Sequence, residues 1–163
     1  MEYPLINTVL SALGDRLAAL PLVEAATPSE EPEPLTETTR LIKDIRAACI
    51  CGYENLFALM PELTAFPAAI IACGGGYYQD AAIRELEVAI IIIDEFQSYG
   101  SAESGYALLD RVSKSLTGES PGQHLKIGNI NYLLRNFDPL ELDSAHTAFL
   151  FDIKATAAFS RPN

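Results

Sequence analysis

Apolar residues recur every three or four positions in two long stretches of the chain. Residues 5–20 form one such stripe and precede Pro21, which predicts an amphipathic helix that packs on a sheet and ends at the proline. Residues 102–116 repeat the pattern and predict a helix that stops at Gly118. The two stripes consist of Leu5, Ile6, Val9, Leu10, Leu13, Leu17 and Leu20, and of Leu108, Leu109, Val112 and Leu116.

The region between residues 24 and 65 changes character. Residues 24–38 alternate prolines with glutamates and contain no Lys or Arg, which predicts a mobile acidic loop that looks like an insertion. An inserted helix is expected over residues 38–51, with Thr36 or Thr38 as its cap. Residues 53–65 are ambiguous and could add a turn of helix before Pro61. The stripe of the inserted helix consists of Leu41, Ile42, Ile45, Ala48 and Cys49.

Strand patterns occupy the rest of the chain. Residues 66–73 predict a short buried strand that ends in a glycine turn at 74–76, and residues 84–93 predict the clearest strand. Residues 148–159 alternate strictly and predict a half-buried antiparallel strand. Shorter strands are expected near residues 124–127 and 129–136.

This order of elements predicts an α+β domain over residues 1–163. Runs of strands with helices that fall together indicate a single, mostly antiparallel sheet flanked by helices. The length of 163 residues suits one domain with a hydrophobic core.

Charge and composition narrow the function classes. The chain has 22 acidic and 11 basic side chains, a formal net charge of −11, and no basic face, so no sequence-specific binding of nucleic acid is expected. Its three cysteines show no disulfide spacing. The start of the chain lacks the positive charge of a signal peptide, and the apolar run Val88–Ile93 is far short of the roughly twenty residues that a membrane helix needs. We therefore expect a soluble, cytoplasmic protein that does not enter the membrane.

The pair Asp94 and Glu95 is the sharpest candidate for chemistry. An apolar strand that ends in Asp-Glu is how ATPases place a magnesium-binding acid and a catalytic base. That chemistry also needs a phosphate-binding loop of the G-x-x-x-x-G-K-[ST] type, which the chain lacks, and Gly74–Gly76 is not followed by lysine. The favoured interpretation is a strand that enters solvent through two acids.

Other clusters predict no catalytic, cofactor-binding or metal-binding residue. The spacing of Cys49 and Cys51 is too tight for the usual zinc sites, although Cys73 or a histidine could in principle complete one. Both histidines, His124 and His146, lie in polar, turn-like stretches and are expected to be ordinary surface residues. A solvated acidic turn is expected from Asp138, Glu141 and Asp143.

Two polar loops that follow strands are the candidate interfaces. Exposed aromatic residues are enriched where proteins meet, which singles out the loops around residues 77–80 and 97–103. The alternative is that these are plain loops with amphipathic tyrosines. The candidate interface residues are Tyr77, Tyr78, Gln97 and Tyr99.

The phrase FPAAII at residues 66–71, the glycines and the long apolar strand after it resemble the small tail proteins of Mu-like phages and prophages. The stretch ALLDRV at residues 107–112, followed by Leu116-Thr117-Gly118, and the closing alternating strand are similar too. This family is related to the tail terminators of long-tailed phages, and the resemblance covers residues 1–20 and 64–160. It implies a sheet flanked by helices and a structural role without catalysis or cofactor: a homo-oligomeric ring, usually six-fold, that caps the tail tube and meets the neck or head. Such a protein would be found in the host cytoplasm during assembly and then in the virion tail.

Two other hypotheses stay open at this point. One is a small nucleotide- or magnesium-dependent enzyme that uses Asp94 and Glu95. The other is an acidic adaptor whose loop at residues 24–38 binds a basic partner.

Overall fold

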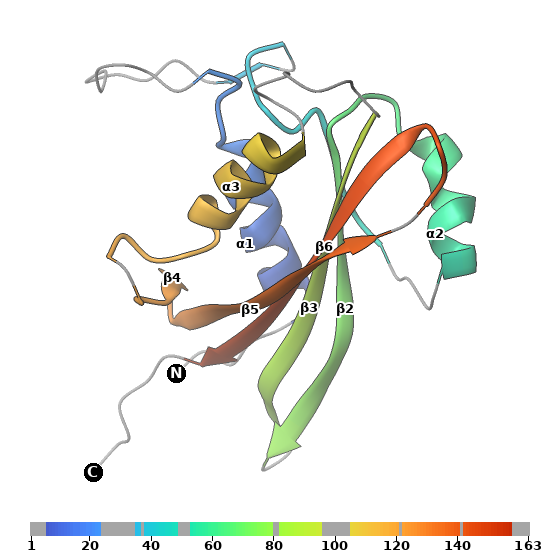
Figure 1. Ribbon diagram of the computed structural model, residues 1–163. Helices are drawn as coiled ribbons and strands as arrows, with labels where there is room; N and C mark the ends of the chain where they lie inside the picture. Colours follow the sequence, from blue (N-terminus) through green and yellow to red (C-terminus); the bar gives the residue numbers. More distant parts are fainter. Residues whose placement is uncertain are drawn as a thin grey trace.

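The structure is a computed structural model that describes residues 6–23, 35–36, 38–48, 53–79, 82–95, 105–120, 122–140 and 142–157. Within these residues the chain forms one six-stranded sheet and three α-helices (Figure 1). The helices are α1 (Ile6–Ala18), α2 (Tyr53–Leu59) and α3 (Gly105–Ser115), with a 3-10 turn, η1 (Met60–Glu62), after α2. The strands are β1 (Asp44–Ala47), β2 (Ala68–Gln79), β3 (Ala82–Glu95), β4 (Leu125–Ile127), β5 (Ile130–Leu140) and β6 (His146–Ala157).

The strands lie in the order β1-β2-β3-β6-β5-β4. Neighbouring strands are antiparallel except β1 and β2, which run parallel, so the sheet is mixed. The prediction of an α+β fold with a mostly antiparallel sheet is confirmed at that level. The long strands β3 and β6 form the centre of the sheet, and the short strands β1 and β4 lie at its edges.

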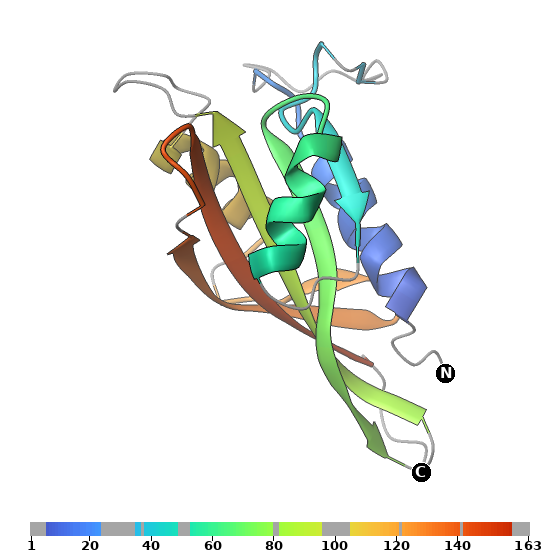
Figure 2. The same ribbon diagram turned by 90° about the vertical axis from the view of Figure 1, so that its right-hand side faces the viewer.

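Helices cover both faces of the sheet (Figures 1 and 2). Helices α1 and α3 pack on one face, here called the α1/α3 face, and α2 packs on the opposite one, the α2 face. Because side chains alternate along a strand, the even residues 86–92 of β3 point to the α1/α3 face, while Ile91 and Ile93 point to the α2 face. Both faces of β3 are therefore buried, as its solidly apolar second half predicts. The larger core includes Val9, Leu13, Leu17, Leu86, Ile90, Ile92, Val112, Phe151 and Ile153.

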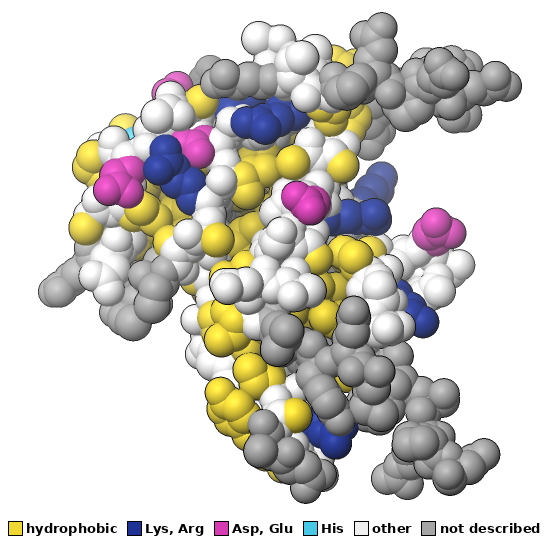
Figure 3. Space-filling view, turned by 180° about the vertical axis from the view of Figure 1, so that it is seen from behind, with side chains coloured by type: hydrophobic (Ala, Val, Ile, Leu, Met, Phe, Trp, Pro, Cys, Tyr) yellow, Lys and Arg dark blue, Asp and Glu magenta, His cyan; other side chains and the backbone are white. Residues whose placement is uncertain are grey.

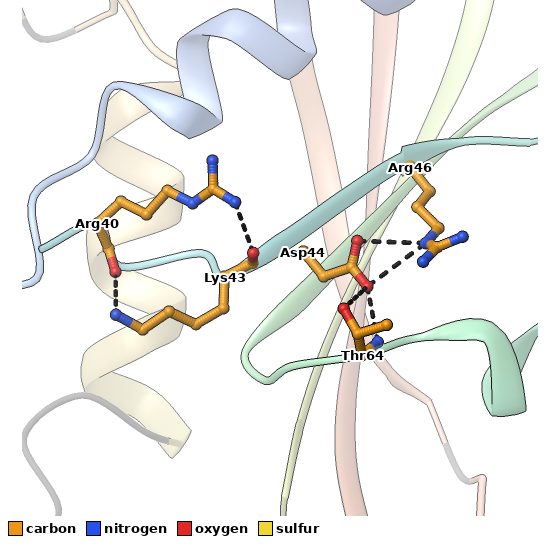
Figure 4. A network of polar contacts seen from close by, with 5 residues as sticks. All are labelled: Arg40, Lys43, Asp44, Arg46 and Thr64. Carbon is orange, nitrogen blue, oxygen red and sulfur yellow. Dashed lines mark hydrogen bonds and ion pairs between the residues drawn. The ribbon is translucent and has the colours of Figure 1, made fainter. Parts of the chain in front are cut away.

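The helix predicted over residues 38–51 is wrong, as far as the described residues 38–48 show. This segment forms turns and then the strand β1 (Figure 4). Its backbone amides bond to distant carbonyls, Leu41 N to Leu20 O and Lys43 N to Pro67 O, which a helix would not allow. Leu41 and Ile42 are fully buried, as the apolar stripe predicts, but burial in the larger core and backbone bonding to distant segments override the helical period.

Side-chain hydrogen bonds of Asp44, at the start of β1, connect this edge strand to the segment before β2. Asp44 accepts hydrogen bonds from the amide of Thr64 at 2.8 Å and from Arg46 Nε at 3.2 Å (Figure 4). Burial alone would raise the pKa of Asp44, but the hydrogen bonds from Thr64 and Arg46 outweigh it and lower that pKa. Arg40 and Lys43 donate to each other's carbonyl oxygens at 2.7 and 2.6 Å, which closes the turn that leads into the strand.

Most of the other predicted elements are confirmed where the structure describes them, but the glycines at 74–76 lie within β2 instead of the predicted turn, and Asp138 lies in β5 instead of the predicted acidic turn. The predicted helices at 5–20 and 102–116 correspond to α1 and α3, and the ambiguous stretch 53–65 contains α2 and η1. The last strand alternates as expected, with Phe149, Phe151, Ile153 and Ala155 buried on one face. The proposed acidic loop falls mostly outside the described residues.

Candidate assembly surfaces

The hairpin of β2 and β3 extends beyond the packed body of the molecule. The glycines at 74–76 do not form the predicted turn; β2 continues through them to Gln79. Strand β1 pairs with β2 only as far as Ile71, and β6 pairs with β3 only as far as Glu85, within the described residues. The end of the hairpin therefore projects at the lower end of the molecule (Figure 2). We call residues Gly75–Gln79, paired with Ala82–Glu87, the arm.

Two of the glycines explain how the strand passes through this sequence. Gly75 has φ of +142°, a conformation that L side chains rarely adopt, and it lies at a bulge where the register shifts. At Gly76 an added Cβ would lie 3.0 Å from the carbonyl oxygen of Glu85, so only glycine lets β3 approach this closely. The triplet thus marks a bulged, tightly paired strand, which the turn prediction did not recognise.

The arm presents two exposed tyrosines to solvent. The exposed fractions of Tyr77 and Tyr78 are 57% and 66%. Successive side chains of a strand point to opposite faces, so the two rings lie on different sides of the arm. Tyr78 pairs with Ile83, whose side chain packs against the core of the α1/α3 face, so Tyr78 belongs to that face. The other two predicted interface residues, Gln97 and Tyr99, lie outside the described residues.

Within the described residues, the outer edge of β2 beyond Ile71 is unpaired, and the two bulges near Gly75 and Tyr78 are its main protection against the addition of another strand. The edge residues Ala72–Gln79, with the sequence ACGGGYYQ, include neither proline nor a charged side chain. Natural sheets normally place such residues, or a bulge, on an exposed edge to prevent another strand from adding to it. Strand β4 pairs with β5 only as far as Tyr132, so the described part of β5 beyond that residue also has an open edge. This part, however, contains Arg135, Asp138 and Pro139. The edge of β2 is therefore the more open of the two.

An aromatic patch lies on the α1/α3 face near the opposite edge of the sheet. Tyr106, at the start of α3, has its ring 6.5 Å from that of Phe149, and Phe137 of β5 has its ring 6.3 Å from that of Phe151. Phe149 and Phe151 are neighbours on one face of β6, so the four rings are continuous. The exposed fractions of Tyr106 and Phe137 are 78% and 49%. We call these four residues the aromatic patch.

The sequence alternation missed this patch because β5 contains a bulge. Ile130, Tyr132 and Leu134 point to the α1/α3 face, and a regular strand would next place Asn136 there. The register shifts between Leu134 and Asn136, so that Phe137 pairs with Phe151 and takes that face instead. Bulges that re-aim a side chain leave no clear signal in a hydrophobic pattern.

Charged side chains form a ladder on the uncovered part of the α2 face. Lys154 Nζ lies 3.0 Å from Glu85 Oε1, and Arg135 Nη2 lies 2.8 Å from Asp152 Oδ2 and 3.4 Å from Glu87 Oε1. All five side chains are substantially exposed, so these pairs contribute little stability. The ladder shows that this part of the sheet faces solvent, in contrast to the apolar α1/α3 face.

The candidate acids Asp94 and Glu95 do not converge on one site. Asp94 does not enter solvent as expected: it is only 4% exposed, and its Oδ1 accepts a hydrogen bond from the amide of Glu95 at 2.9 Å. Burial raises the pKa of Asp94, and the charge of Glu95 adds to that effect. Register places Glu95 opposite His146, whereas Asp94 pairs with Thr147 and points to the other face.

His146 is not the plain surface residue that its polar surroundings predict. Its Nδ1 lies 2.9 Å from Asp143 Oδ1, and its ring lies 5.1 Å from that of Phe66. The hydrogen bond with His146, together with the amide of Ala145, lowers the pKa of Asp143. These contacts fasten the start of β6 to the loop before β2. His124 is exposed as expected.

The remaining candidates give no site within the part of the chain that the structure describes. No group of three or more His, Cys, Asp or Glu side chains there is arranged to hold a metal ion. Cys73 is half-buried against the core, as expected of a small apolar residue, while Cys49, Cys51 and Glu141 lie outside the described residues. No described helix has the length and apolar character needed to cross a bilayer.

Comparison with known proteins adds no relative: no family model matches the chain, and no curated protein is significantly similar to it.

Proposed function

We propose that this chain is a structural protein of a phage or prophage tail, a tail terminator that closes into a ring on the end of the tail tube. The observation that supports it best is the arm, whose β2 strand is uncharged, carries two exposed tyrosines and is unpaired along its outer edge within the described residues. Its partners would be further copies of itself, most simply six in a ring, and the tail-tube and neck proteins. It would act in the host cytoplasm during assembly and remain in the virion tail.

The positions of the two exposed apolar surfaces support ring formation. The arm extends from β2, on one side of the sheet, and the aromatic patch includes Phe137 of β5, on the other side. Two different surfaces on opposite sides of a subunit suit a heterologous contact, which generates a ring when the rotation closes. A contact between identical surfaces would give a dimer and leave no surface for further copies.

Charge supports the same proposal. A chain with a net charge of −11 repels its own copies, so they can associate only through surfaces where charge is absent or balanced. The exposed parts of the arm's β2 strand and of the aromatic patch are uncharged. We therefore expect added salt, which screens the repulsion between copies, to strengthen assembly.

The enzyme hypothesis receives no comparable support. A magnesium-dependent site would need carboxylates that converge on one ion, and Asp94 and Glu95 point to opposite faces of β3. The adaptor hypothesis depends on the loop at residues 24–38, which is mostly outside the described residues. We propose neither.

Native mass spectrometry over a concentration series, with and without a magnesium nucleotide, tests the proposal. A closed oligomer of defined size, most tellingly a hexamer, without a nucleotide adduct is expected. A monomer that binds the nucleotide would contradict the structural role and favour a site at Asp94 and Glu95.

A further inference from the structure

The two exposed apolar surfaces point to each other as partners. We propose that Tyr78 on the arm of one copy packs against the aromatic patch of the next copy, at Tyr106 and Phe137. This inference rests on the proposed function, because it names the contact that would link the subunits of the ring. The partner is a second copy of this chain.

The faces on which these residues lie agree with such a contact. Tyr78 lies on the α1/α3 face of the arm, because it pairs with Ile83, and Phe137 lies on the same face of β5, because it pairs with Phe151. When the sheets of two subunits lie edge to edge, residues on the α1/α3 face of one subunit lie on the same side as those on the α1/α3 face of the next. The ring of Tyr78 then meets the aromatic patch rather than the charged ladder on the α2 face.

Strand directions agree with this arrangement as well. Along the order β2-β3-β6-β5 every neighbour is antiparallel, so β2 and β5 run in opposite directions. The β2 strand of one copy placed beside β5 of the next is therefore antiparallel. Because β5 carries Arg135, Asp138 and Pro139 along this edge, the contact is made by side chains rather than by a continuous backbone ladder. The open edge of β2 between Ala72 and Gln79 can then approach the next subunit without a proline or a charge on its own side.

The contact requires a defined stagger between the two copies. Across the sheet, Phe137 pairs with Phe151, Phe151 with Ile90, and Ile90 with Ile71. Phe137 is therefore at the same height on the sheet as Ile71, and Tyr78 lies seven residues further along β2. At about 3.3 Å per residue the next copy is displaced by roughly 23 Å along the strands. Closed assemblies of strands accept such a displacement when the strands are inclined to the ring axis, as strands are in barrels.

The chemistry of the two surfaces is complementary. Tyrosine is among the residues most enriched at energetically dominant contact points, and aromatic rings favour tilted packing against other rings. Tyr106 and Phe137 already form tilted contacts with Phe149 and Phe151, at interplanar angles of 44° in both cases. A ring added between them extends an existing aromatic row. Figure 3 shows that hydrophobic side chains are also exposed towards the lower end of the molecule, where the arm lies.

The test uses two variants that each lack one half of the contact. The arm variant is Tyr78→Ser, and the patch variant is Phe137→Ser. Native mass spectra are recorded at about 100 µM chain, where even a weak protein contact is populated. The wild type is expected to form a ring, and each variant alone is expected to be a monomer. An equal mixture of the two is expected to form a one-to-one dimer, because the arm of the patch variant can still bind the patch of the arm variant.

Two further variants keep the result interpretable. If Phe137→Ser does not fold, Tyr106→Ser serves as the patch variant. Because the Tyr106 side chain is 78% exposed, its replacement should have little effect on the stability of the subunit. Phe57→Ser removes an equally apolar ring, 45% exposed, from α2 on the other face, and the ring oligomer should persist.

Several outcomes would overturn the inference. They are a monomeric wild type, a ring that survives Tyr78→Ser, or a mixture of arm and patch variants that stays monomeric. If the oligomer survives Phe137→Ser and Tyr106→Ser but not Tyr78→Ser, the arm binds a different surface, such as another arm. The proposed function fails separately, when the wild type neither forms a ring nor stops the growth of tail tubes.

Discussion

The buried hydroxyl group of Tyr132 leads to a prediction about the stability of the fold. The side chain is 1% exposed, and its Oη has no hydrogen-bond partner among the residues that the structure describes. A buried hydroxyl without a partner costs about 1–3 kcal/mol relative to its hydrated state. The substitution Tyr132→Phe removes the hydroxyl and keeps the ring, so it should stabilise the fold by about that amount.

The expected effect can be measured by thermal and chemical unfolding. For a chain of 163 residues, a stabilisation of 1 kcal/mol raises Tm by about 2–4 °C. Tyr77→Phe is the matched control, because the Tyr77 side chain is 57% exposed and lies on the side of the arm away from Tyr78. Its Tm should not change.

The same hydroxyl predicts a pH dependence. Burial raises the pKa of Tyr132 to about 12, from 10.0 in the unfolded chain. A raised pKa in the folded state means that the unfolded chain loses this proton first, so the stability is intact below pH 10 and falls as the pH rises towards 12. The advantage of Tyr132→Phe should therefore grow by about 1.4 kcal/mol per pH unit in that window. A lower Tm for Tyr132→Phe at pH 7, or a constant difference between pH 10 and 12, would refute the reasoning.

Four further substitutions test other parts of the structure by chemical unfolding. Asp44→Asn should destabilise the fold by about 1–3 kcal/mol at pH 7, and this loss should disappear as the pH falls below 3.8, because the pKa of Asp44 is lowered in the folded state. Asp94→Asn should have the opposite sign, with a gain at pH 7 that shrinks on acidification, because burial raises the pKa of Asp94. Phe151→Ala should cost about 3–5 kcal/mol, whereas Phe57→Ala should change stability by less than about 1 kcal/mol. Equal effects at Phe151 and Phe57 would contradict the assigned core.

The sequence predicts those elements whose apolar residues face a single neighbour. Helices α1 and α3 and strand β6 each have one regular period, which burial in the structure follows, whereas β3 is recognised by its continuous apolar run and is buried on both faces. The segment at 38–48 misleads because Leu41 and Ile42 are both fully buried in the larger core, and with Ile45 they fit the spacing of a helical stripe. No local signal distinguishes it from a helix, because the strand depends on pairing with β2, more than twenty residues away.

The assembly surfaces were predicted only in part, and the reason is geometric. The sequence identifies Tyr77 and Tyr78 as exposed aromatic residues. The glycines before them, however, predict a turn, and for that reason the sequence does not predict the arm. Phe137 reaches the aromatic patch through a bulge, and Tyr106 lies at the start of a helix whose stripe points elsewhere. Both depend on tertiary register, which hydrophobic periodicity does not contain.

The growth of tail tubes in the presence of this chain tests the proposed function most directly. Tube protein from the same phage or prophage is allowed to polymerise with and without the purified chain, and tube lengths are measured by electron microscopy. Shorter tubes are expected, each with a ring at one end, and Tyr78→Ser is expected not to shorten them. Tubes of unchanged length with bare ends in the presence of the wild-type chain would contradict the proposed function.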